Sequence, residues 1–208
     1  CLAFHDNTQD VTIALDVGLG RGYIAWLYHC SDPTSGQNLF VIAEYILVLG
    51  RYLHAVARQD NQANPDRPAA PFAVNQIVHR SNDRIERDVE ICARWKVPVW
   101  ITSMGAREDV NQAAHECGGT VLHDVINNKY ARKAIDKGAD GLIAVCAGAG
   151  GHAGALSPFA LVQEIREWFD GPLALSGSIA TGRAVLAAQA MGADFGYIGS
   201  PLIAMTEA

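Results

Sequence analysis

The most restrictive feature of this sequence is a regular alternation of short apolar runs and amphipathic stretches after residue 70. Six apolar runs begin near positions 72, 97, 120, 141, 172 and 195, which places their starts 21 to 31 residues apart. The intervals have room for helices with apolar positions every three or four residues. Such an alternation predicts a parallel sheet whose strands are joined by right-handed helical crossovers.

Helix signals lie between the expected strands, which are 72–78, 97–103, 120–125, 141–145, 172–175 and 195–198. Asn82 can cap the first helix, and the Ser157-Pro158 pair is typical of a helix start. Gly118 and Gly138 are typical of helix ends. The chain after residue 70 therefore consists of regular βα units.

A doubly wound open sheet and a (β/α)₈ barrel both satisfy this pattern. Two features favour the barrel: a glycine-rich loop follows a late strand, and small residues follow the last two strands, in Ser176-Gly177-Ser178-Ile179 and Gly199-Ser200. Barrels commonly bind phosphate through the backbone N–H groups of loops in this place. We expect an α/β fold of the TIM-type (β/α)₈ barrel class with parallel strands, either complete or incomplete at its two ends.

Residues 1–70 are harder to interpret, but we expect one barrel domain over residues 1–208, with 1–70 as an atypical N-terminal part and 71–208 as the regular units. The runs 12–15 and 22–28 can each form a strand and supply the two strands that a barrel still lacks. The sequence begins at Cys1 and its first methionine is Met104, so we expect it to be processed or incomplete.

Composition excludes several classes of protein. A net charge of −6, with 16 scattered Lys and Arg residues, argues against a nucleic-acid partner. Five cysteines without Cys-x-x-Cys spacing suggest neither a disulfide framework nor a zinc site, so we expect no metal and reduced thiols in the cytoplasm. The longest apolar stretch, 39–50, contains Glu44 and is too short to span a bilayer, and no signal-peptide pattern opens the chain. We expect a cytoplasmic protein without a membrane partner.

The glycine-rich loop runs from Cys146 to Gly154 and surrounds one histidine, His152, with small residues. A flat ligand can lie against such a bare backbone, and His152 is the side chain there that can exchange a proton near neutral pH. Two other interpretations remain open: the loop can be a mere connection, or the histidine can make a structural hydrogen bond that closes it.

The segment from Pro71 to Ala208 resembles the nitronate monooxygenase family, formerly called 2-nitropropane dioxygenases. The matching motifs are Pro71-Phe72-Ala73-Val74-Asn75, Ile101-Thr102-Ser103-Met104-Gly105, His123-Asp124-Val125, 138–145, the Ala-Gly-Gly-His-Ala-Gly run ending at Gly154, Leu156-Ser157-Pro158-Phe159, Gly177-Ser178-Ile179-Ala180 and Gly199-Ser200. The resemblance implies a TIM barrel that contains FMN, with His152 as the catalytic base. The sequence lacks the early Ala-Pro-Met type segment with which family members open.

The resemblance also implies roles for other residues. Asn75 would hydrogen-bond the flavin ring, although its amide can instead satisfy a strand end. His123 and Asp124 would line the pocket, and Asp124 can equally be a helix cap or a fold-stabilising carboxylate. Gly150 and Gly151 would let the ring approach the backbone. The expected phosphate-binding residues are Ser176, Gly177, Ser178, Gly199 and Ser200.

The leading functional hypothesis is FMN-dependent oxidation of alkyl nitronates and nitroalkanes to carbonyl compounds and nitrite, with O2 as the oxidant. One alternative is an FMN-dependent NAD(P)H reductase of enoyl thioesters or quinones, and another is a non-catalytic barrel that binds phosphate or flavin. The expected partners are a small-molecule substrate, O2 and, as one option, a second copy in a homodimer. The sequence does not identify the physiological substrate.

Overall fold

The computed structural model describes residues 11–18, 23–30, 71, 73–150 and 154–199. Its strands are β1 (Val11–Gly18), β2 (Tyr23–Cys30), β3 (Ala73–Ile77), β4 (Val99–Ser103), β5 (Thr120–Val125), β6 (Gly141–Val145), β7 (Leu173–Ser176) and β8 (Phe195–Ile198). Its helices are α2 (Ile85–Arg94), α3 (Glu108–Glu116), α4 (Asn128–Asp136), α5 (Pro158–Arg166) and α6 (Gly182–Ala190). All six strands expected after residue 70 are present.

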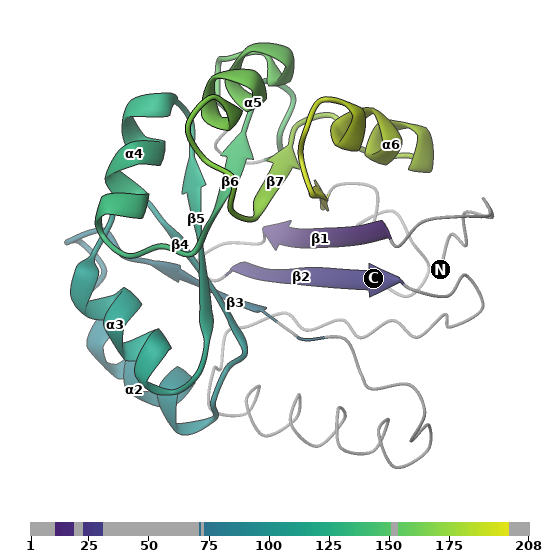
Figure 1. The fold of residues 1–208 in the computed structure, drawn as a ribbon. Helices are drawn as coiled ribbons and strands as arrows, with labels where there is room; N and C mark the ends of the chain where they lie inside the picture. Colours follow the sequence, from purple (N-terminus) through teal and green to yellow (C-terminus); the bar gives the residue numbers. More distant parts are fainter. Residues whose placement is uncertain (1–10, 19–22, 31–70, 72, 151–153, 200–208) are drawn as a thin grey trace, which may run out of the picture.

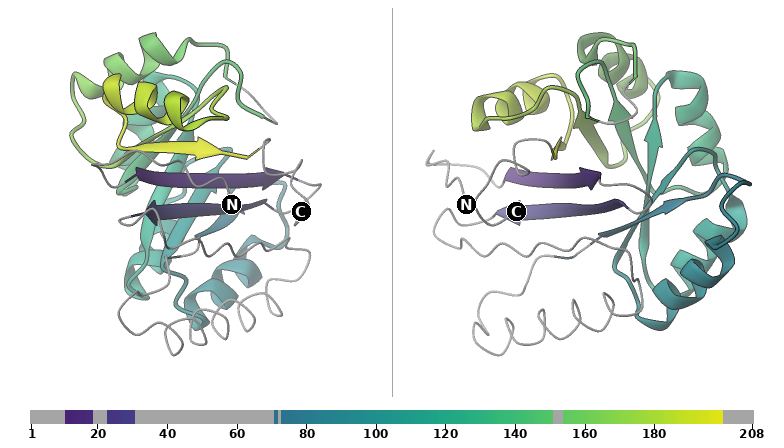
Figure 2. Two further views of the ribbon diagram at one scale, coloured as in Figure 1. Left: turned by 90° about the vertical axis from the view of Figure 1, so that its right-hand side faces the viewer. Right: turned by 180° about the vertical axis from the view of Figure 1, so that it is seen from behind.

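The strands form one curled sheet in the order β2-β1-β8-β7-β6-β5-β4-β3, and the ladder from β3 to β8 is parallel throughout. Figure 1 shows the helices on the outer, convex side of this sheet. The views in Figure 2 show the same curl from the side and from behind. The fold is thus an incomplete (β/α) barrel, in agreement with the fold class expected from the alternation.

The first two strands depart from the expected all-parallel arrangement. β1 lies parallel to β8, but β2 pairs with β1 in the antiparallel direction, from Val11 opposite Cys30 to Gly18 opposite Tyr23. Residues 19–22 separate the two strands, and a parallel pair needs a crossover of a dozen or more residues. Such a short connection permits a hairpin, so residues 11–30 do not form a βα unit.

The two faces of the sheet carry different side chains, as the alternation of a strand requires. On the outer face, Trp100, Val121, Leu142 and Leu173 are fully buried and pack with apolar residues of the helices in one large core. The inner, concave face carries a smaller apolar cluster made of strand residues alone: Ala73, Val99, Ile101, Leu122, Ile143, Ala174 and Tyr197. This inner cluster is the filling of the incomplete barrel.

The start of the first helix differs from the expected cap. Asn82 accepts a hydrogen bond from the Arg84 N–H at 3.1 Å and donates one to the carbonyl of Ile77 at 2.8 Å. The cap position of α2 is Arg84, whose side chain makes no capping bond. Asn82 therefore fixes the turn between β3 and the helix and does not cap the helix itself. The expected start of α5 is confirmed, because the helix begins at Pro158 with Ser157 in the cap position, although the Ser157 side chain makes no capping hydrogen bond.

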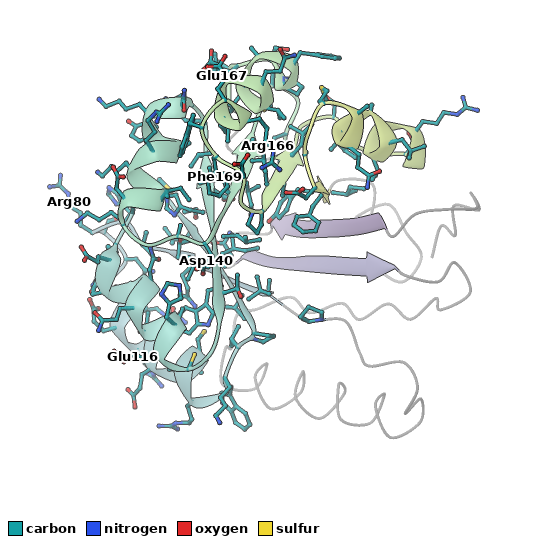
Figure 3. All side chains as sticks on the ribbon, viewed as in Figure 1. Arg80, Glu116, Asp140, Arg166, Glu167 and Phe169 are labelled. Carbon is teal, nitrogen blue, oxygen red and sulfur yellow. The ribbon has the colours of Figure 1, made fainter. Side chains whose placement is uncertain are left out.

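At the edge of the sheet where the parallel strands begin, two similar contacts join neighbouring strands. Asp140 accepts the N–H of Val121 at 2.7 Å, and Asp194 accepts the N–H of Leu173 at 2.8 Å. Arg166 lies 2.6 Å from the Asp194 carboxylate, and its guanidinium also donates to the carbonyls of Phe169, Gly171 and Gly192. Figure 3 shows Arg166 and Phe169 beside each other below α5. Each aspartate follows a Gly-Ala pair and ties a strand to the one before it.

Two kinds of feature are absent from the described part of the chain. None of its helices is long and apolar enough to cross a membrane. The same residues contain no group of three or more His, Cys, Asp or Glu side chains placed to hold a metal ion.

Candidate active site

The carboxyl ends of parallel strands meet at one edge, and this edge carries the loops singled out in the sequence. The loop after β6 is attached at its base: the N–H of Cys146 donates to the carbonyl of Ser176 at 2.8 Å, and the N–H of Ala147 donates to the carbonyl of Leu156 at 2.9 Å. The two ends of the 146–156 segment are thereby held together. His152 and Gly151 lie in the stretch 151–153, outside the described residues.

The loops after β6 and β7 contact each other through Gly148 and Ser178. The Ser178 N–H donates to the carbonyl of Gly148 at 2.9 Å. Both residues have left-handed backbone, with φ of 86° at Gly148 and 53° at Ser178. The Ser178 N–H is therefore already used within the protein, and a phosphate contact by Ser178 would have to come from its exposed hydroxyl.

Glycine is favoured at three positions in these loops because a side chain there would overlap neighbouring atoms. A Cβ atom on Gly148 would lie 1.9 Å from the Ser178 Oγ, and one on Gly154 would lie 2.0 Å from the carbonyl oxygen of Val145. A Cβ on Gly177 would lie 2.9 Å from the carbonyl oxygen of Ala147. The sequence suggests that these glycines leave a bare backbone for a ligand. In the structure they also make room for the neighbouring chain segments to pack closely. Gly150 lies exposed beyond that contact.

Cys146, at the start of the loop, is a buried thiol on the helix-facing side of the sheet. Burial raises the pKa of Cys146 to about 11, so the thiol remains protonated at neutral pH. A protonated, buried thiol is a poor nucleophile. Cys146 therefore acts in packing.

Polar side chains line the inner face near the carboxyl edge. Asn75 on β3 accepts a hydrogen bond from the hydroxyl of Ser103 on β4, with 3.3 Å between the two oxygens. Asp124 on β5 lies two positions after Leu122 of the inner cluster, so it is on the same face of the sheet, and it pairs in register with Ile143. Ser176 is buried at the end of β7, two positions after Ala174, and is therefore on the inner face as well. The structure thus brings Asn75, Asp124 and Ser176 onto one concave surface.

His123 lies on the other face. It alternates with Asp124 along β5, is 3% exposed, and shares a 2.6 Å hydrogen bond between its Nδ1 and the Thr102 Oγ1. Burial, reinforced by the charge of Lys133 on α4, lowers the pKa of His123 to about 4. The strand alternation directs this histidine toward the helices and away from the concave surface that Asp124 faces. A pocket-lining role for His123 therefore finds no geometric support.

The remaining expected residues lie at the ends of the last two strands. Ser176 is the last residue of β7, Gly177 and Ser178 directly follow that strand, and Gly199 directly follows β8. Because β7 and β8 pair in parallel, these residues occupy neighbouring positions at the carboxyl edge. Ser200 lies outside the described residues.

Two residues of the same surface were not among those expected from the sequence. Ser103 holds the Asn75 amide, and Tyr197 on β8 is 6% exposed within the inner cluster. The signal that could have found them is the two-residue period of a strand. Ser103 lies two positions after Ile101, and Tyr197 lies two positions after Phe195, so each shares the inner face with that residue. Met104, with φ of 61° and 56% exposure, follows Ser103 at the same edge.

Comparison with known proteins agrees with this arrangement. The model of the family described as nitronate monooxygenase matches residues 53–208, which is more than half of the chain and includes every element from β3 onward. The chain belongs to the nitronate monooxygenase family. The family is one of flavin-dependent oxidoreductase enzymes.

Individual relatives are more distant. A Mycobacterium tuberculosis protein named (3aS,4S,5R,7aS)-5-hydroxy-7a-methyl-1-oxo-octahydro-1H-indene-4-carboxyl-CoA dehydrogenase is 27% identical over 180 residues, which is 85% of this chain and 49% of that protein. A nitronate monooxygenase of Neurospora crassa is 32% identical over 113 residues, covering 50% of this chain and 30% of the relative. The chain thus spans about half of the length of the first relative and less than a third of the second.

Solved structures show the same fold. FabK from Thermotoga maritima, in its M276A mutant, superposes with a TM-score of 0.62 at 29% identity, over 74% of this chain and 51% of FabK. A nitroalkane oxidase from Streptomyces ansochromogenes superposes with a TM-score of 0.61 at 21% identity, over 74% of this chain and 56% of that structure. At 21% identity the second likeness speaks for the fold alone.

Proposed function

We propose that this nitronate monooxygenase family member binds FMN and oxidises alkyl nitronates and nitroalkanes to carbonyl compounds and nitrite, with O2 as the oxidant. The observation that carries the proposal is the family match over residues 53–208, which includes the carboxyl-edge loops and the polar inner surface. The proposed partners are a small-molecule substrate and O2. Residues 1–208 as one domain, a homodimer and a cytoplasmic location remain predictions.

The residues at the carboxyl edge fit FMN in their chemistry. The phosphate end would meet Ser176, Gly177, Ser178, Gly199 and Ser200, none of which carries a negative charge. The amide of Asn75, held by Ser103, and the backbone near Gly150 and Gly151 would meet the ring. Hydroxyl and backbone N–H donors suit a phosphate, and an amide that both donates and accepts suits the ring's nitrogen and oxygen atoms. When bound, FMN supplies the electron transfer and the reaction with oxygen.

We assign the proton transfer to His152. A neutral nitroalkane carries an acidic hydrogen on the carbon next to the nitro group, and this proton must leave before the carbon can be oxidised. An imidazole has a pKa suited to accept it near neutral pH. His152 lies outside the described residues, so the assignment rests on the Gly150-Gly151-His152 motif and on family membership. A nitronate arrives without this proton and does not need the base.

A second candidate function is reduction or oxidation of a CoA thioester, the class that includes the enoyl thioester reductase expected as an alternative from the sequence. The observation in its favour is the match over 85% of this chain to a protein named as a carboxyl-CoA dehydrogenase. This alternative would use a nicotinamide cofactor together with FMN. Both candidates place the flavin at the same edge.

The experiment that decides between them starts from the purified chain. Bound flavin would give a yellow protein that releases FMN on denaturation, and a colourless protein that does not take up added FMN would contradict both candidates. Oxygen consumption with propionate 3-nitronate or a nitroalkane supports the proposed oxidation. Rapid reduction of the bound flavin by NAD(P)H, without oxygen uptake on the nitronate or the nitroalkane, would instead contradict the proposed oxidation and favour the second candidate.

A further inference from the structure

The contact between the loops after β6 and β7 is built at two levels. At the strand ends, the N–H of Cys146 donates to the carbonyl of Ser176 at 2.8 Å. Further out, the Ser178 N–H donates to the carbonyl of Gly148 at 2.9 Å, and the Ser178 hydroxyl lies 3.5 Å from the same oxygen. The second level lies beyond the last residues of both strands.

This outer level is maintained against a backbone preference. Ser178 has φ of 53°, a conformation in which a side chain costs free energy that glycine avoids. The Ser178 side chain is exposed, so the serine gains no burial in return. Strained backbone of this kind persists where the surrounding structure fixes it and is frequent at functional sites.

The contact also leaves little room for a side chain at Gly148 or Gly177. A Cβ on Gly148 would lie 1.9 Å from the Ser178 Oγ and 3.1 Å from the Ser178 Cβ. On the other side, a Cβ on Gly177 would lie 2.9 Å from the carbonyl oxygen of Ala147. The hydrogen bond from the Ser178 N–H to the carbonyl of Gly148 therefore ties the two loops together at a point where they pack closely.

We propose that Ser178 is a positioning residue whose contact with Gly148 couples FMN binding by the loop after β7 to proton abstraction at the loop after β6. This inference rests on the proposed function, because it takes the β7 loop as the phosphate site and the β6 loop as the source of the base. It assigns the Ser178 backbone to a role between the loops. The coupling makes the position of Gly148 depend on FMN occupancy.

The test uses the full chain and four variants: Gly148→Ala, Ser178→Gly, the two together, and Gly138→Ala. Gly138 is a matched control because its φ is also 86°, while a Cβ there meets nothing within 4 Å. Gly138→Ala thus carries the backbone cost alone, and Gly148→Ala carries the same cost plus the clash with Ser178. The measurements are FMN affinity by quenching of flavin fluorescence, the melting temperature, and kcat/KM for a neutral nitroalkane and for its nitronate.

Gly148→Ala is expected to weaken FMN binding about 10-fold and to lower the ratio of nitroalkane to nitronate kcat/KM at least about 10-fold, as for a small misplacement of a reacting group. In the Ser178→Gly background the same substitution is expected to change both quantities by less than about 3-fold, because the two nearest atoms are gone. Gly138→Ala is expected to lower the melting temperature by roughly 2–4 °C and to leave both quantities unchanged. If Gly148→Ala does not fold, Gly177→Ala tests the same junction.

Two results would overturn the inference. One is an equal effect of Gly148→Ala in both backgrounds, with FMN binding and nitronate oxidation intact in the parent protein, which would leave the proposed function standing. The other is a parent protein that binds no FMN, which would remove the proposed function and the coupling together. Loss of the nitroalkane ratio in Gly138→Ala counts with the first result, since it would trace the effect to backbone strain.

Discussion

The Thr102 Oγ1 and the His123 Nδ1 lie 2.6 Å apart in the buried layer between the sheet and its helices. Burial there lowers the pKa of His123 from 6.5 to about 4, with a further contribution from Lys133. The unfolded chain therefore binds a proton between these two values that the folded chain does not bind. The contribution of His123 to the free energy of unfolding is fully present above pH 6.5 and is lost as the pH falls toward 4. From this residue we expect a loss of about 2 kcal/mol in the free energy of unfolding between pH 7 and pH 5.

The measurement is urea unfolding at pH 7, 6 and 5 for the parent protein and for His123→Gln. Glutamine does not titrate, so the variant is expected to start less stable at pH 7 but to lose about 2 kcal/mol less than the parent over the same range. Parallel pH profiles would show that His123 does not carry this dependence. FMN affinity should change little in the variant, because the side chain faces away from the concave surface.

The strands of this fold could be predicted from the sequence, but the face on which His123 lies was not. The six strands could be predicted because each apolar run is compact and the intervals are regular. The resemblance implies a pocket position for both His123 and Asp124, although neighbouring strand residues face opposite sides of a sheet. Applying the two-residue period would have kept Asp124 and Ser176 on the inner face, added Ser103, and moved His123 to the helix side.

Other parts of the structure depend on contacts between segments far apart in the sequence. Gly148 and Ser178 are thirty positions apart, and nothing local to either one signals that their backbones meet at 2.9 Å. The antiparallel β2 is a different case, because the expected runs 12–15 and 22–28 are separated by only six residues, which is too short for a helical crossover. The roles proposed for His152, Gly151 and Ser200 remain predictions.

Asp194 offers a prediction about the stability of the opposite edge. Its carboxylate accepts the N–H of Leu173 and lies 2.6 Å from Arg166. Asp194→Ala leaves that N–H and a guanidinium group without this acceptor, so we expect the free energy of unfolding to fall by about 1–3 kcal/mol. Asp194→Asn keeps an oxygen for Leu173 and should lose less. Urea unfolding provides the measurement.

The control for this prediction is Glu90→Ala. Glu90 pairs with Arg94 at 3.4 Å, but both side chains are more than half exposed. Exposed pairs of this kind contribute between about 0 and 1 kcal/mol. A loss in Glu90→Ala as large as that in Asp194→Ala would mean that the hydrogen bond to the strand contributes nothing specific.

Gly199 tests the proposed phosphate site. It follows β8 at the edge where β7 ends at Ser176 and is followed by Gly177. Gly199→Asp is expected to repel the phosphate dianion and to weaken FMN binding by at least about 10-fold, because like charges at contact distance cost more than 1 kcal/mol. Gly199→Asn has nearly the same size without the charge and separates the two effects. FMN titration and circular dichroism are the measurements, and unchanged FMN affinity in Gly199→Asp would rule out this loop as the phosphate site.

The last prediction concerns His152 as the proposed base. A general base contributes about 10²–10⁴-fold to a rate, but only when a proton has to be removed. His152→Asn should therefore depress kcat/KM for a neutral nitroalkane by that factor and leave oxidation of the corresponding nitronate within a few fold of the parent. Each substrate is assayed for oxygen uptake at matched FMN content, with His115→Asn as the control, because His115 lies at the end of α3 and contacts Asp140 at the opposite, amino-terminal edge.

The two substrates separate a base from a residue that only binds. Equal losses on nitroalkane and nitronate at unchanged FMN content would assign His152 to substrate binding or electron transfer. Loss of FMN in His152→Asn would assign it to the structure of the loop, the interpretation left open by the glycine-rich sequence around it. A loss confined to the neutral nitroalkane is the outcome that a base at this position requires, because the nitronate differs from it by the proton that the base removes.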